Sequence, residues 1–193
     1  FVALCAVIPL GWMLRGKERV LERAALVMGL LPWTPLVTVN LVSHETYRGA
    51  DRGFEFTHID LFAWVLLFAL PRPSEPMPFR KVQLLYFFAG ALTLVGSVVP
   101  LYTAFTLWKL LRMFVFVAVM WRVCATPTRM VKVLDGLALG LIFQALYCVK
   151  LRYLDGYHQI AGVFSHQNSL GMAVNIVLPL QLARFMSTGS RLS

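Results

Sequence analysis

Apolar and polar positions follow one another along this chain in blocks, with long apolar runs separated by short polar connectors. The apolar runs lie near residues 1–14, 24–42, 55–70, 82–99, 107–124, 133–149 and 169–185. None shows the period-2 alternation of a barrel strand, and several approach the roughly 20 residues that a helix needs to cross a bilayer. Because backbone groups in hydrocarbon must bond within their own segment, such runs form helices. The pattern predicts an all-α fold, a polytopic transmembrane helical bundle of about seven spans.

Composition supports a membrane protein. Hydrophobic residues make up 59% of the 193 residues and charged residues only 14%. A soluble chain of this size has no interior large enough to bury that much apolar surface. We therefore expect residues 1–193 to form a single transmembrane domain in contact with lipid. The chain opens without Met on an apolar residue and stops shortly after an apolar run, so we expect it to be a fragment of a longer protein.

The net charge of +9 comes from Lys and Arg in connectors at the ends of the predicted helices. A bias of basic residues toward one side marks the cytoplasmic face of a membrane protein. Counted over seven spans, it predicts that residues 43–58 and 150–168 face away from the cytoplasm. Because topology accounts for the charge, we expect no nucleic-acid partner. The cysteines and histidines lack metal-ligand spacing, so no metal site is predicted.

Small and charged residues mark the ends and faces of two predicted helices. Gly136 and Gly140 form a G-x-x-x-G pair that is typical of close helix packing. Lys109 and Arg112 share one face near the non-cytoplasmic end of their helix. They could extend toward the headgroups, or they could hold the pyrophosphate of a lipid-linked substrate.

Residues 150–179 contain the tightest cluster of chemically active side chains. These are Arg152, Asp155, His158, His166 and Asn168. The last two stand at the start of a predicted helix, where free backbone N–H groups favour an anion such as phosphate. Alternatively, Ser165 or Asn168 only caps the helix. Spacing alone leaves both readings open.

Residues 162–168, GVFSHQN, are followed by Ser-Leu-Gly-Met and an apolar helix. This segment resembles the G-x-F-x-H-x-N segment of the O-antigen ligase and O-antigen polymerase superfamily, which leads from an extracytoplasmic loop into a transmembrane helix. Residues 48–64 are similar to the second extracytoplasmic loop and following helix of exopolysaccharide-associated members. Many members have Pro after the motif His and Arg shortly before the motif Gly. Here Gln167 follows His166, and the nearest upstream arginine is Arg152.

The resemblance implies a multi-pass glycosyltransferase of the bacterial inner membrane. It would move a glycan from an undecaprenyl-pyrophosphate carrier to an acceptor without a metal or other cofactor, and it specifies neither glycan nor acceptor. The substrate-binding candidates are Arg152, His158, Gly162, His166, Asn168, Lys109 and Arg112. Members carry catalytic Arg and His residues in a later periplasmic loop that this chain does not contain, so we expect the fragment alone to be inactive. His166 is the one catalytic candidate.

Two other functions fit the same sequence. A polysaccharide flippase or transporter would favour broken helices and charges along a central path. A non-catalytic assembly component of an exopolysaccharide system would share the fold and lack the active loop.

Overall fold

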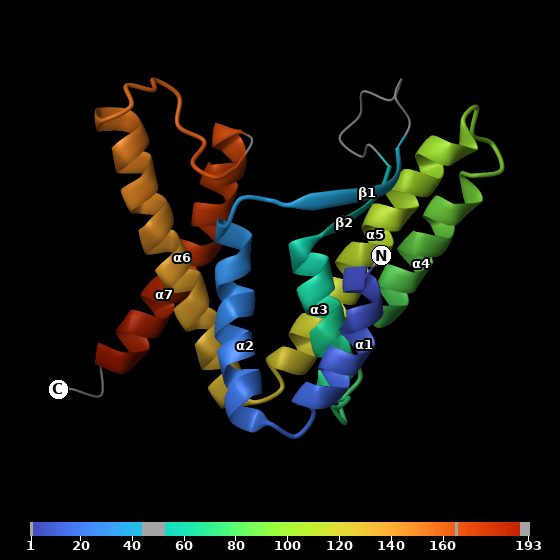
Figure 1. Ribbon diagram of the computed structural model, residues 1–193, viewed down its shortest axis with the longest axis horizontal. Coiled ribbons are helices and arrows are strands. Elements are labelled where there is room, and N and C mark those ends of the chain that lie inside the picture. The colour runs from blue at the N-terminus through green and yellow to red at the C-terminus, as the bar shows by residue number, and fades with distance from the viewer. Residues whose placement is uncertain (1, 44–52, 165, 190–193) are drawn as a thin grey trace. The chain divides into compact units, whose positions relative to one another are not determined.

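The computed structural model describes residues 2–43, 53–164 and 166–189. Over these residues the chain is mostly helical, with one small antiparallel sheet (Figure 1). The helices are α1 (Val2–Leu14), α2 (Glu18–Leu30), α3 (His58–Ala69), α4 (Arg80–Leu92), α5 (Pro100–Val123), α6 (Pro127–Tyr153) and α7 (Gln167–Gly189). Strands β1 (Thr38–Ser43) and β2 (Gly53–Thr57) pair with Thr38 opposite Thr57.

These elements divide into two compact units. Unit 1 comprises Phe1–Lys17 and Val37–Ala125, and unit 2 comprises Glu18–Leu36 and Thr126–Ser193. Each unit is described by itself below. The single transmembrane domain expected from the sequence stays a prediction.

Three of the described helices are long and apolar enough to cross a membrane. They are α5 with 24 residues, α6 with 27 residues and the 21-residue part Gln167–Ser187 of α7. The apolar runs predicted at 107–124, 133–149 and 169–185 fall in these three helices. Helices α6 and α7 extend beyond their runs at both ends, whereas α5 begins before its run and ends at Val123. Predominantly helical structure is therefore confirmed.

The prediction of about seven spans is wrong for the described residues. Helices α1, α3 and α4 have only 12 or 13 residues each. At 1.5 Å per residue they reach about 20 Å, which is less than the roughly 30 Å of a bilayer core. The expected spans at 1–14, 55–70 and 82–99 are therefore short helices. In the last case the helix ends at Leu92, well before the apolar run does.

The expected span at 24–42 is replaced by three different elements. Helix α2 ends at Leu30, a 3-10 turn covers Leu31–Trp33, and β1 begins at Thr38. Pro32 and Pro35 lack the N–H that a continuing helix needs. The β-branched residues Thr38, Val39 and Val42 then suit a strand. The sheet also corrects the all-α prediction.

In unit 1, α3 packs against α1 on one side and α5 on the other, and α4 lies along α5. Gly11 of α1 permits the first contact, because a Cβ there would meet Phe68 and the carbonyl of Val65. The hairpin joins α5 through rings, with Phe54 edge-on to Phe105 and Phe56 edge-on to Trp108.

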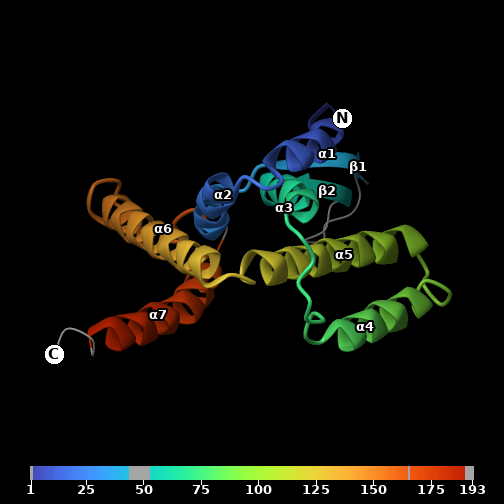
Figure 2. The ribbon, with the colours of Figure 1, turned by 90° about the horizontal axis from the view of Figure 1, so that it is seen from below.

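In unit 2, α2 and α7 flank α6 (Figure 2). The interface with α2 is tight because Gly136 of α6 faces the α2 backbone. A Cβ at Gly136 would collide with the carbonyl of Leu26, and a Cβ at Gly140 would collide with the indole of Trp33. The close packing predicted from the G-x-x-x-G pair is therefore seen. Arg129, 4% exposed, adds an ion pair to Glu18 of α2 at 3.3 Å.

Candidate functional site

The C-terminal end of α6 brings two predicted site residues together. The Arg152 guanidinium donates to the carbonyl of Tyr157 at 3.2 Å and lies 3.4 Å from Nδ1 of His158. Lys150 pairs with Asp155 at 3.2 Å in the same turn. All four of these polar side chains are exposed. The end of α6 therefore presents a cation and an imidazole to solvent, while the Asp155 carboxylate is already paired to Lys150.

The motif glycine, Gly162, lies directly against α6. Its φ of +61° is in the left-handed region, and a Cβ there would overlap the amide of Gln144. Gln144 is 1% exposed, so it has little room to move away. Two residues later, Phe164 packs edge-on against Trp33 with ring centroids 6.0 Å apart. The loop is thus attached to the body of unit 2 just before α7 begins.

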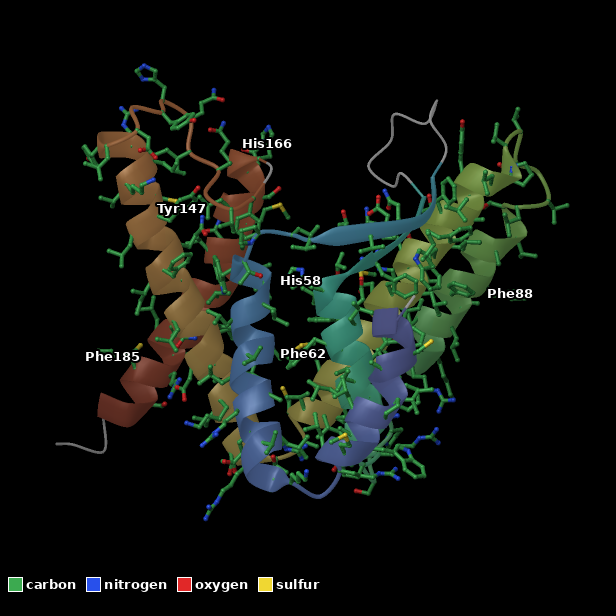
Figure 3. The ribbon with its side chains drawn as sticks, in the orientation of Figure 1. His58, Phe62, Phe88, Tyr147, His166 and Phe185 are labelled. Carbon is green, nitrogen blue, oxygen red and sulfur yellow. The ribbon has the colours of Figure 1, made fainter. Side chains whose placement is uncertain are left out.

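The candidate catalytic residue, His166, caps α7. The backbone N–H of Asn168 donates to Nδ1 of His166 at 3.2 Å, and the backbone N–H groups of Ser169 and Leu170 donate to the His166 carbonyl. An N–H can only donate, so Nδ1 is an acceptor and the neutral ring carries its proton on Nε2. The exposed His166 ring, labelled in Figure 3 at the start of α7, therefore offers an N–H donor to a ligand.

This geometry changes both interpretations of the start of α7, the anion site and the cap by Ser165 or Asn168. The cap is His166 itself rather than Asn168, and Ser165 lies outside the described residues. The first-turn N–H groups of residues 168–170 already have acceptors. An anion at this end of α7 would therefore bind through the imidazole and the helix dipole.

One face of α7, marked by Asn168, Gly171 and Asn175, is open within the described chain. Asn168, Gly171 and Asn175 are all exposed, and a Cβ at Gly171 would meet nothing within 4 Å. In a bilayer an unpaired amide at Asn175 is costly, so this face of α7 needs a polar partner if α7 spans.

The two remaining predicted site residues belong to α5 in unit 1. Arg112 forms an ion pair with Asp60 at 2.6 Å, and the two side chains are 15% and 9% exposed. Asp60 also accepts from the backbone N–H and the hydroxyl of Thr57, both at 2.7 Å, which completes a capping box at the start of α3. Arg112 therefore connects α5 to the junction of β2 and α3. Lys109 is exposed one turn earlier on α5.

Sequence reasoning missed Thr57 and Asp60, although a signal was present. Thr57-x-x-Asp60 directly before an apolar run has the spacing of a capping box. No local pattern, however, pairs Asp60 with Arg112 on a different helix.

The described residues contain no group of three or more His, Cys, Asp and Glu side chains that could hold a metal ion. No protein-family model, curated protein sequence or solved structure matches the chain.

Proposed function

We propose that the protein is a membrane glycan transferase of the O-antigen ligase or polymerase type. The observation that carries the proposal is the start of α7, where an exposed imidazole is held with its N–H outward. Arg152 stands in the last turn of α6, and His158 lies on the loop that leads from α6 to this helix. The proposal places this end of unit 2 on the extracytoplasmic side of a bacterial inner membrane.

The chemistry required of such a site is charge stabilisation. As the acceptor hydroxyl attacks the first sugar, its proton passes to solvent, the bond from the sugar to the undecaprenyl pyrophosphate breaks, and negative charge builds on the leaving phosphate. The His166 Nε2–H, the Arg152 guanidinium and the positive end of α7 can stabilise that charge. Because the backbone of Asn168 occupies Nδ1, His166 serves in this scheme as a donor rather than as the base.

A substitution that keeps the cap and removes the imidazole tests the proposal. Asparagine is among the best helix-capping residues, so His166→Asn preserves the start of α7 whereas His166→Ala removes the cap as well. Both variants are expressed in a strain that lacks the chromosomal gene, with Gln167→Ala as the exposed neighbouring control. Surface polysaccharide and lipid-linked precursor are measured at matched membrane levels.

We expect both His166 variants to lose surface polysaccharide and accumulate precursor, while Gln167→Ala stays active. Full activity of His166→Asn would reduce residues 162–168 to a helix-capping motif and remove the support for transfer at this site. Movement of lipid-linked glycan across the membrane without any transfer would favour a flippase instead.

A further inference from the structure

Unit 1 contains an arginine-rich pocket whose lining includes no residue of the proposed transfer site. The pocket, of about 430 Å³, lies between the proline-rich connector 71–79 and helices α4 and α5. Three arginines line it, Arg72 from the connector, Arg80 from the start of α4 and Arg122 from the end of α5. Glu75 is the one carboxylate in the lining. We call this site the arginine pocket.

The positive charge of the arginine pocket is not neutralised within the described part of the chain. None of Arg72, Arg80 and Arg122 forms an ion pair with a described residue. Arg80 and Lys81 open α4, whose first turn contains no acidic residue, so the positive end of the helix dipole adds to the same field. Like charges gathered in one pocket repel one another, and a bound anion relieves that repulsion.

Part of the arginine pocket is already held in place. The Arg122 guanidinium donates to the carbonyls of Leu67 and Leu70 at 2.7 and 3.3 Å, which are the last turn and the end of α3. The Trp121 indole N–H donates to the carbonyl of Glu75 at 3.4 Å. The connector and Arg122 are therefore fixed to α5 before any ligand binds, which lowers the entropic cost of binding.

Apart from Glu75 and Gln83, the rest of the lining is apolar. Leu84 of α4 and Phe114, Ala118 and Trp121 of α5 form the wall that continues from the arginines along the two helices. A ligand that fills this site therefore needs an anionic group at one end and a hydrocarbon part at the other. Phe88, further along α4, is exposed on the same helix (Figure 3).

The position of the arginine pocket on α5 agrees with an amphiphilic ligand. Trp121 and Arg122 stand in the last turn of a helix that is long and apolar enough to cross a membrane, where the headgroup zone would lie. The adjoining α5–α6 region also carries Arg129 and Lys132. That basic bias predicts the cytoplasmic side, where basic pockets between helices bind anionic lipid headgroups.

We propose that the arginine pocket binds an anionic phospholipid of the cytoplasmic leaflet. The phosphate lies on Arg72, Arg80 and Arg122, and an acyl chain runs along Leu84, Phe114 and Ala118. This binding does not depend on glycan transfer, and its test does not use that activity.

Lipid binding to the purified full-length protein is measured by native mass spectrometry. Phosphatidylglycerol, phosphatidylcholine and inorganic phosphate are titrated separately. The test variant is Arg72→Gln with Arg80→Gln. Both side chains are exposed, and neither forms a hydrogen bond or ion pair with a described residue. The control, Arg19→Gln with Arg23→Gln, removes the same charge from α2, where a pocket also lined by Glu22 and Lys132 has a single apolar residue, Leu26.

We expect the wild type and the control to bind phosphatidylglycerol equally and the test variant to bind it about 30-fold more weakly. Equal affinity of the test and control variants would overturn the proposal, as would equal binding of phosphatidylcholine and phosphatidylglycerol by the wild type. A second variant, Ala118→Phe, fills the apolar wall and keeps every charge. It should bind the lipid at least several-fold more weakly. If inorganic phosphate instead competes fully and Ala118→Phe binds normally, the pocket is an anion site without a lipid chain and the proposal fails.

Discussion

Arg112 of α5 and Asp60 of α3 form an ion pair of 2.6 Å that is almost closed to solvent. The carboxylate is shared, because Thr57 donates to it from its backbone and its hydroxyl. Asp60 therefore caps α3, accepts hydrogen bonds from the last residue of β2 and pairs with Arg112 of α5. The Arg112 guanidinium does not make all of its possible hydrogen bonds, because its buried Nε has no partner among the described residues.

Breaking this pair should be costly. Asp60→Ala or Arg112→Ala leaves the other charge buried without its counterion, and we expect a loss of about 3–5 kcal/mol in the free energy of unfolding. The value is obtained by denaturant titration of the detergent-purified protein. Asp155→Ala breaks the exposed pair with Lys150 and should cost no more than about 1 kcal/mol. Equal losses in the two pairs would contradict the structural role assigned to Arg112.

The same pair makes Lys109 and Arg112 separable in function. If Lys109 contacts the pyrophosphate of the carrier, Lys109→Ala should raise the KM for lipid-linked donor at least several-fold and leave the amount of folded protein unchanged. Arg112→Ala should mainly lower the amount of folded protein. Initial rates against donor concentration, normalised to folded protein, distinguish the two. A Lys109→Ala enzyme with wild-type KM would remove Lys109 from the carrier site.

Two helical glycines of unit 2 should respond oppositely to a methyl group. A Cβ at Gly136 would collide with the carbonyl of Leu26, so Gly136→Ala should destabilise unit 2 by about 1–3 kcal/mol. Gly171 faces open space, and Gly171→Ala should stabilise α7 by up to about 1 kcal/mol through helix propensity. Thermal unfolding of the two variants, compared with the wild type, checks both signs. Destabilisation by Gly171→Ala would show that its face is covered in the folded protein.

The motif glycine can be tested against a glycine of similar backbone. Gly156 has φ +74° and open space around it, whereas Gly162 has φ +61° and lies against Gln144. Gly156→Ala should therefore cost about 1–2 kcal/mol from the left-handed conformation alone. Gly162→Ala should cost clearly more and should displace the start of α7. Hydrogen exchange at the amide of Asn168 reports that displacement, and equal effects of the two variants would argue against the contact with Gln144.

The long helices were predictable because their apolar runs are continuous. The runs at 107–124, 133–149 and 169–185 lie in helices except for Cys124, which follows the last residue of α5, and the contact of Gly136 with α2 follows from its spacing to Gly140. The ion pair of Lys132 and Asp135, three residues apart, could also be read from the sequence, since such residues are neighbours on a helix.

The strand, the ends of the helices and the partner of Arg112 depend on features that a hydropathy pattern does not contain. The run at 24–42 is mostly apolar, so a strand after Pro35 looks the same as a membrane helix on a hydropathy scale. Length was the second source of error, because an apolar run does not specify where its helix ends. Arg112 could be placed on a face of α5, but its partner comes from a helix whose packing only the tertiary structure reveals.

Trp33 gives the motif a fixed position along α6. Its side chain is 1% exposed, it occupies the notch left by the missing side chain of Gly140, and its ring meets Phe164. A side chain at position 140 would push the indole outward and, with it, the ring two residues before His166. The location of His166 therefore depends partly on the absence of a side chain at Gly140. A search confined to residues 162–168 would overlook this dependence.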